Sequence, residues 1–196
     1  MDGYIKQIFL YLVIMYTVLI DNGHGVDTLG KRSPKKEDGT RIFEWEYTRE
    51  VAKVLKATLM GMGYRVELIT PEIYDIPLTV RVRRINDFVK KYRAKNCILI
   101  SLHLNAAGNN DQWMSARGWS AYTTPGQNNS DKLAECLYDY AKIVLESDKE
   151  YVDSFKPPTI QKPIRTEKID GDSDFESNFY IIKGANCPAV LTENLF

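Results

Sequence analysis

The chain has 196 residues, of which 44% are apolar and 27% are charged, as in a soluble globular protein with one domain of ordinary size. Lys+Arg and Asp+Glu each number 26, so the basic excess typical of nucleic-acid or anionic-membrane binding is absent, and we expect no nucleic-acid partner. Three scattered cysteines, Cys97, Cys136 and Cys187, argue against a disulfide framework and a thiolate zinc site.

An apolar run lies near the start of the chain. Residues 8–20 are apolar apart from Thr17, which is shorter than the roughly 20 residues that span a bilayer. Lys6 precedes the run as in a signal peptide, but no small-residue cleavage site follows it. We therefore expect residues 1–15 to be an N-terminal extension, a vestigial signal or an extra strand, without stable membrane insertion.

Apolar periodicity predicts strands and helices in alternation from Tyr16 onward. In chain order, the predicted elements are a buried strand at 16–20, a polar loop at 21–41, a helix at 43–62, a strand at 64–69, a helix at 78–92 with basic residues on its solvent face, a strand at 97–102, a strand at 118–123, a helix at 130–146, a long loop or insertion at 147–177, and strands at 179–182 and 189–192. This order predicts one α/β domain over residues 16–196, with a mostly parallel, twisted sheet of about six strands flanked by helices.

Both histidines of the chain lie where predicted strands end. His24 follows the first strand, His103 follows the apolar run ILISL, and Glu193 ends the last strand. Ligand sites of open α/β sheets form at the carboxyl ends of the strands. Either histidine alone is more often a turn or core residue, but two imidazoles that converge on one edge are typical of a transition-metal site.

A zinc site of this kind needs a third ligand, and without a nearby cysteine we expect a carboxylate. The acidic residues in the neighbouring sequence are Asp21, Asp27, Glu37, Asp38, Glu44 and Glu46. Glu44 is favoured because it begins the first helix, next to the same edge of the sheet, and Glu46 points about 200° away around that helix. Glu193 fits the role of general base, because an unpaired carboxylate is costly to bury for packing alone.

Four segments of the chain resemble the zinc-dependent N-acetylmuramoyl-L-alanine amidases of the amidase 3 type. They are VLIDNGHG, in which Asn22 replaces the proline of the family's Asp-Pro-Gly-His-Gly; EWEYTREVAKVLKATLMGMGYRVELIT; RVRRINDFVKKYRAKNCILISLHLNAAGN; and FYIIKGANCPAVLTE. The order and spacing of these segments cover the chain from Tyr16 to its C-terminus.

The resemblance implies a site and a reaction. It implies one Zn²⁺ per chain on His24, Glu44 and His103, with Glu193 as the catalytic base. The implied substrate is peptidoglycan, cleaved at the amide between N-acetylmuramic acid and the L-alanine of the stem peptide. The implied location is the cell envelope, either periplasmic or secreted. Sequence adjacency adds two residues that orient the ligands, Asp21 and Asn105.

Further expectations concern the first motif and the end of the chain. Gly23 and Gly25 are expected to let the backbone bend around His24, and Asn22 is expected to leave this turn looser than proline does. Because only three residues follow Glu193, the closing C-terminal helix of the family is expected to be absent. Residues 170–174, DGDSD, resemble a fragment of a calcium loop but lack the rest of its pattern, so they predict no calcium site.

Three alternatives to a wall amidase remain open from the sequence. The first is a zinc peptidase or deacylase that acts on another amide, and the second is a catalytically impaired cell-wall-binding module. The third is an unrelated α/β domain with structural histidines. The sequence makes no prediction of the oligomeric state.

Overall fold

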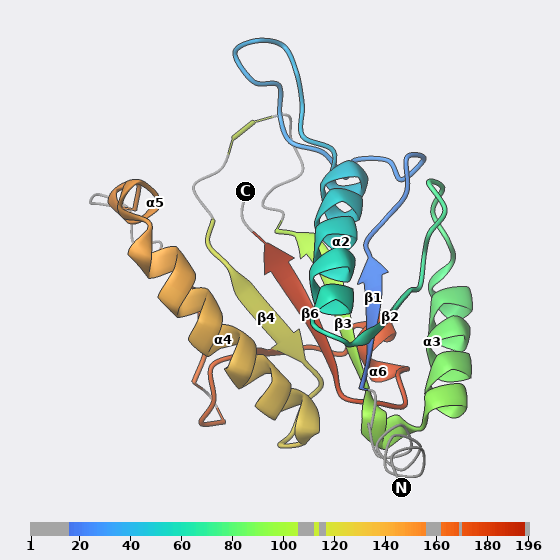
Figure 1. Cartoon of the computed structure of the whole chain (residues 1–196). Helices are drawn as coiled ribbons and strands as arrows, with labels where there is room; N and C mark the ends of the chain where they lie inside the picture. The colour runs from blue at the N-terminus through green and yellow to red at the C-terminus, as the bar shows by residue number, and fades with distance from the viewer. Residues whose placement is uncertain (1–15, 106–111, 114–116, 156–161, 169, 195–196) are drawn as a thin grey trace, which may run out of the picture.

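The protein is described by a computed structural model for residues 16–105, 112–113, 117–155, 162–168 and 170–194 (Figure 1). The expectation for residues 1–15 lies outside the described residues. Among the residues described, no helix is both long and apolar enough to cross a membrane.

One six-stranded sheet forms the centre of the domain, with the strand order β2-β1-β3-β6-β4-β5 (Figure 1). The strands are β1 Thr17–Asn22, β2 Arg65–Leu68, β3 Cys97–Leu104, β4 Ser120–Thr123, β5 Phe175–Glu176 and β6 Ala189–Asn194. Strands β2, β1, β3 and β6 run parallel, β4 runs antiparallel to β6, and β5 runs parallel to β4. The predicted α/β class with a mostly parallel sheet is confirmed.

Helices cover both faces of this sheet. The covering helices are α2 Glu44–Gly61, α3 Leu78–Tyr92, α4 Asn129–Ser147 and α6 Tyr180–Lys183. Helix α5 Lys149–Asp153 follows α4 beyond the sheet, and a 3₁₀ turn lies at Ala94–Asn96 (Figure 1). Leu19 and Leu99 pack against α3 and α6 on one face, whereas Ile20 packs with α2 and Val190 with α4 on the other. Because Leu19, Ile20 and Leu99 are fully buried, each contributes about 1.5–3 kcal/mol of apolar burial.

The predicted strand at 179–182 is wrong, because the chain forms the short helix α6 there. Ile181 and Ile182 are consecutive and both are buried, which the alternating faces of a half-buried strand do not allow. A short apolar run does not distinguish a strand from a buried helical turn by periodicity alone.

The segment at 147–177, predicted to be a loop, contains two short elements. Helix α5 begins after Asp148, whose side chain accepts a hydrogen bond from Tyr151 N at 2.9 Å. Strand β5 then adds to the edge of the sheet beside β4. The described part of this segment therefore extends the sheet.

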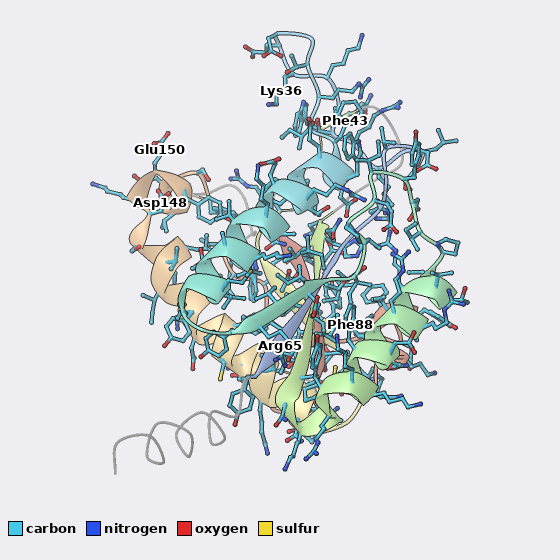
Figure 2. All side chains as sticks on the ribbon, turned by 45° about the vertical axis from the view of Figure 1, so that its right-hand side comes forward. Lys36, Phe43, Arg65, Phe88, Asp148 and Glu150 are labelled. Atoms are coloured by element: carbon cyan, nitrogen blue, oxygen red, sulfur yellow. The ribbon has the colours of Figure 1, made fainter. Side chains whose placement is uncertain are left out.

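The polar loop between β1 and α2 projects beyond the carboxyl edge of the sheet. Backbone hydrogen bonds join its two arms, from Ser33 N to Ile42 O and from Lys36 N to Thr40 O, both at 2.8 Å. Figure 2 shows Lys36 near the tip of this loop and Phe43 at its base, where α2 begins.

Candidate metal centre at the carboxyl edge of the sheet

Three parallel strands and one helix bring the predicted ligands and base to the same edge. His24 lies two residues beyond the end of β1, and Glu44 is the first residue of α2. His103 lies near the end of β3 and Glu193 near the end of β6, and these two are register partners. Because register partners on neighbouring parallel strands project from the same face of a sheet, Glu193 accompanies His103.

His24, Glu44 and His103 form a compact group of donor atoms. Glu44 Oε1 lies 3.4 Å from His24 Nε2 and 3.0 Å from His103 Nδ1, and one ligand atom from each residue lies within 4.8 Å of the others. Tetrahedral zinc with bonds of about 2.0–2.1 Å places its ligand atoms about 3.3 Å apart. Two imidazole nitrogens and a carboxylate oxygen at these separations therefore fit zinc.

The protonation states of the group also suit metal binding. Burial lowers the pKa of His24 to about 4, so its imidazole is neutral at pH 7 and has a free lone pair. Burial raises the pKa of Glu44, but contacts with His103 and His24 outweigh that effect and hold the pKa below its usual value. Glu44 is consequently an ionised carboxylate at neutral pH.

The backbone on either side of His24 lies very close to neighbouring groups. A Cβ on Gly23 would lie 2.5 Å from His103 Cε1, and one on Gly25 would lie 1.9 Å from Asp75 N. The left-handed backbone conformation falls on His24 itself, at φ +61°, a region that side chains other than glycine seldom adopt. The glycines were expected to bend the backbone, but the structure instead uses them to admit the neighbouring groups.

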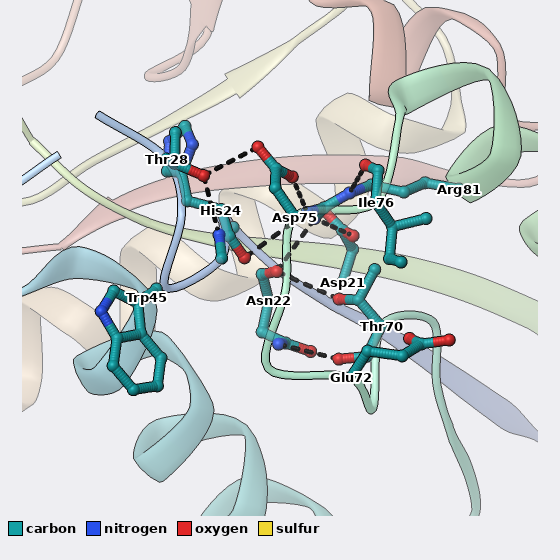
Figure 3. Close-up of polar contacts among 12 residues, drawn as sticks. Asp21, Asn22, His24, Thr28, Trp45, Thr70, Glu72, Asp75, Ile76 and Arg81 are labelled. Carbon is teal, nitrogen blue, oxygen red and sulfur yellow. Dashed lines mark hydrogen bonds and ion pairs between the residues drawn. The ribbon is translucent and has the colours of Figure 1, made fainter. Parts of the chain in front are cut away.

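Asn22 holds this turn in place by hydrogen bonds (Figure 3). Its side-chain Nδ2 donates to Thr70 O at 3.0 Å, and Thr70 Oγ1 donates back to Asn22 O at 3.1 Å. Asn22 and Thr70 are both buried. Paired hydrogen bonds to the segment after β2 therefore restrain the turn at Asn22, and its looseness relative to a proline turn stays a prediction.

Arg81 lies at the centre of the network in Figure 3. This buried guanidinium donates to Asp21 Oδ1 at 2.9 Å, Asn22 O at 2.9 Å and Asp75 Oδ1 at 2.7 Å. It also lies 3.5 Å from His24 O. The expectation that the basic residues of α3 face solvent is wrong for Arg81, which shares the buried stripe of its helix with Ile85 and Val89.

Asp21 and Asn105, both predicted to orient the ligands, occupy different positions. Asp21 is buried and bonded to Arg81 and to Ser101 Oγ, and Arg81 Nη2 in turn lies 3.5 Å from His24 O. Asn105 has a buried side-chain Nδ2 without a hydrogen-bond partner. Asn194, which the sequence analysis did not single out, donates from Nδ2 to His103 O at 2.9 Å.

Glu193 carries an unpaired buried oxygen, Oε2. Burial raises its pKa, an effect that His103 partly opposes. A buried carboxylate oxygen without a partner, beside a group of possible metal ligands, is free to accept a proton from a bound molecule.

The structure is an α/β domain with two histidines and a glutamate that could hold a metal ion at its carboxyl edge. The family model for N-acetylmuramoyl-L-alanine amidase matches residues 18–196. The chain therefore belongs to this family, the amidase 3 type of peptidoglycan hydrolase, as its sequence motifs predicted. No curated protein sequence matches the chain significantly.

Several solved structures share the fold. The CwlD amidase from Clostridioides difficile, in complex with the GerS lipoprotein, is 16% identical with a TM-score of 0.59, over 92% of this chain and 82% of that one. An N-acetylmuramoyl-L-alanine amidase from Clostridium difficile 630 is 21% identical with a TM-score of 0.61, over 91% and 78%. The catalytic domain of CwlV, an N-acetylmuramoyl-L-alanine amidase from Bacillus (Paenibacillus) polymyxa var. colistinus, is 18% identical with a TM-score of 0.60, over 91% and 79%.

Proposed function

We propose that the protein is a zinc-dependent hydrolase that cleaves the amide between N-acetylmuramic acid and L-alanine in peptidoglycan. The observation that carries this proposal is the meeting of His24, Glu44 and His103 around one point, with atom separations of 3.0 and 3.4 Å. Membership of the amidase family supplies the substrate class. The same membership supports a location in the cell envelope, where peptidoglycan lies.

In this proposal, His24, Glu44 and His103 would hold one zinc ion per chain. When bound, zinc supplies Lewis-acid polarisation of an amide carbonyl and acidifies water. Glu44 Oε1 accepts a hydrogen bond from Leu104 N at 3.1 Å and also contacts both histidines. These contacts hold the carboxylate in one orientation. Arg81, Arg49 and Asn194 act as positioning residues, because they bond to the backbone carbonyls of the ligand-bearing segments.

Glu193 moves the proton in this proposal. Its unpaired Oε2 accepts a proton from the attacking water as the new C–O bond forms. The same oxygen then delivers the proton to the amide nitrogen as the C–N bond breaks. The products are the free lactyl carboxylic acid of the muramic acid and a stem peptide with a free L-alanine amino group.

The activity test uses zinc-loaded full-length protein and purified peptidoglycan, with released stem peptides identified by mass spectrometry. Wild type is expected to release peptides that begin with L-alanine. Glu193→Gln is expected to keep one zinc per chain and lose activity by about 10²- to 10⁴-fold, the usual contribution of a positioned acid–base group. Full activity in Glu193→Gln contradicts the assignment of the base.

A matched pair on α2 tests the ligand assignment in the same assay. Glu44→Gln is expected to lose both zinc and activity, whereas Glu46→Gln, which alters an exposed acid two residues away, retains both. Three outcomes contradict the amidase. Cleavage within the stem peptide indicates a peptidase, release of acetate indicates a deacylase, and wall binding without any release indicates a binding module.

A further inference from the structure

A second group of carboxylates lies far from the candidate zinc centre. Asp131 in the first turn of α4 meets Asp172 and Asp174, which precede β5, and one ligand atom from each lies within 4.8 Å of the other two. Because β4 runs opposite to β6, its end at Thr123 lies at the other end of the sheet from Glu193 (Figure 1). The two groups therefore occupy opposite ends of the domain.

Two buried oxygens of this second group have no partner. Asp174 is 1% exposed, and its Oδ1 is unpaired, as is Oδ1 of Asp172. Within the described residues, no lysine or arginine forms an ion pair with Asp131, Asp172 or Asp174. Buried negative charge without a cation is strongly unfavourable.

Hydrogen-bond donors reach only some of the carboxylate oxygens. Gln127 Nε2 donates to Asp172 Oδ2 at 2.6 Å, and Asn128 N donates to Asp131 Oδ2. Thr123 Oγ1 lies 2.8 Å from Asp131 Oδ1 and 2.7 Å from Asp174 Oδ2. A hydroxyl has one proton, so Thr123 can donate to only one of these two carboxylates. Oδ1 of Asp172 and Oδ1 of Asp174 are therefore free to take up a proton or to bind a metal ion.

The chemistry of the group selects the class of ion. All the side-chain donors are carboxylate oxygens, which are the ligands of hard cations, and oxygens at 2.3–2.6 Å from one Ca²⁺ lie up to about 5 Å apart. An open pocket of about 550 Å³ borders the group and is lined by Gln127, Asn128, Asn129, Asp131, Lys132, Glu135 and Asp172. The Lys132 ammonium donates to Asn129 Oδ1 at 3.3 Å and forms no ion pair with the three aspartates among the described residues. The pocket leaves room for the waters that complete a coordination shell of six to eight oxygens.

We propose that Asp131, Asp172 and Asp174 bind one Ca²⁺, which fastens the segment before β5 to the start of α4 and the end of β4. The site is independent of the zinc-dependent function proposed above. The fragment DGDSD lacks the pattern of a calcium loop and by itself predicted no calcium site. The third carboxylate of the proposed site, Asp131, lies 41 residues before Asp172, so the fragment does not contain it.

Binding of calcium alone tests the proposal. The zinc-loaded full chain is dialysed against radioactive CaCl₂, and its melting temperature is followed up to about 10 mM calcium, above the Kd range of weak extracellular calcium modules. We expect one saturable Ca²⁺ per chain. At about 100 times the Kd, the melting temperature is expected to rise by about 5–10 °C.

Variants locate the ion. Asp172→Asn and Asp174→Asn are expected to lose calcium binding and the rise in melting temperature, whereas Asp139→Asn, which alters an exposed acid on the same helix, keeps both. His103→Ala is expected to lose zinc and keep calcium, which separates this test from that of the amidase. Absence of calcium binding at about 10 mM, or wild-type binding in Asp172→Asn, overturns the proposal and leaves a shared proton as the source of the charge.

Discussion

Replacing Arg81 by methionine is expected to lower the free energy of unfolding and to weaken zinc binding at the same time. The substitution removes hydrogen bonds of 2.7–2.9 Å to Asp21, Asn22, Asp75 and Ile76. It also leaves the carboxylate of Asp21, which is 1% exposed, without its cation. Removing one partner of a buried ion pair costs about 3–5 kcal/mol.

The same helix offers a matched control in Arg84→Met. Arg84 also pairs with a carboxylate, that of Glu72 at 2.6 Å, but the two side chains are 32% and 37% exposed. A pair as exposed as this contributes about 0–1 kcal/mol, and the hydrogen bond from Arg84 Nη1 to Ile69 O at 2.9 Å adds about 1 kcal/mol. Urea unfolding of the two variants is therefore expected to separate them by about 1–4 kcal/mol, which is about 2–16 °C in melting temperature for a chain of this length.

Zinc affinity is the second readout of the Arg81→Met experiment. Arg81 holds the carbonyl of Asn22 and approaches that of His24, so its loss is expected to weaken zinc binding by about 10- to 100-fold, as for other outer-shell groups. Arg84→Met is expected to leave the affinity unchanged. Equal destabilisation by the two variants, or unchanged zinc affinity in folded Arg81→Met, refutes the role assigned to this network.

Three further substitutions follow from the structure. Gly23→Ala is expected to cost about 1–3 kcal/mol of unfolding free energy by overpacking and to lose zinc, because the added Cβ meets His103 Cε1 at 2.5 Å. Its control, Gly61→Ala, has nothing within 4 Å of the added Cβ. Calorimetry is expected to find this control neutral or stabilised by up to about 1 kcal/mol. Tyr138→Phe is expected to cost about 1–3 kcal/mol in urea unfolding, because the buried hydroxyl bonds to Ala121 N and Arg165 O, whereas Tyr140→Phe, at 71% exposed, costs almost nothing. Burial and the neighbouring acids raise the pKa of Asp174 to about 7, so without calcium the folded state binds a proton that the unfolded chain releases near pH 4, and the free energy of unfolding falls as pH rises from about 4 to about 7. Urea titrations across this range are expected to show a smaller fall in Asp174→Asn, and an equal fall contradicts the assignment.

The candidate zinc site could be predicted from the sequence because the rule that locates it is topological. His24, His103 and Glu193 follow apolar runs, and parallel strands end at the same edge of a sheet. The rotation between helix positions favours Glu44 over Glu46 as the third ligand. The structure places Glu44 Oε1 within 3.4 Å of a ring nitrogen of each histidine. Long, strongly periodic segments therefore predict well where a strand ends and which side of a helix faces the sheet.

The support around the site was harder to predict because its contacts are long-range. Arg81 and Asp21 are 60 residues apart, and no pattern near either residue indicates the other. The periodicity of α3 does indicate burial of Arg81, because Arg81 lies on the same helix stripe as Ile85 and Val89. A charged residue is nevertheless expected to face solvent, because arginine is seldom fully buried. The error at Ile181 and Ile182 has another cause, because a run of four residues is too short for its period to show.

Anomalous diffraction at the zinc edge, from crystals of the zinc-loaded protein, tests the central claim most directly. The account predicts one peak at about 2.0–2.2 Å from His24 Nε2, His103 Nδ1 and a carboxylate oxygen of Glu44. It also predicts that Glu44→Gln removes this peak and that Glu193→Gln retains it. A zinc-loaded crystal with no peak between these three side chains, or with its zinc bound elsewhere, contradicts the account.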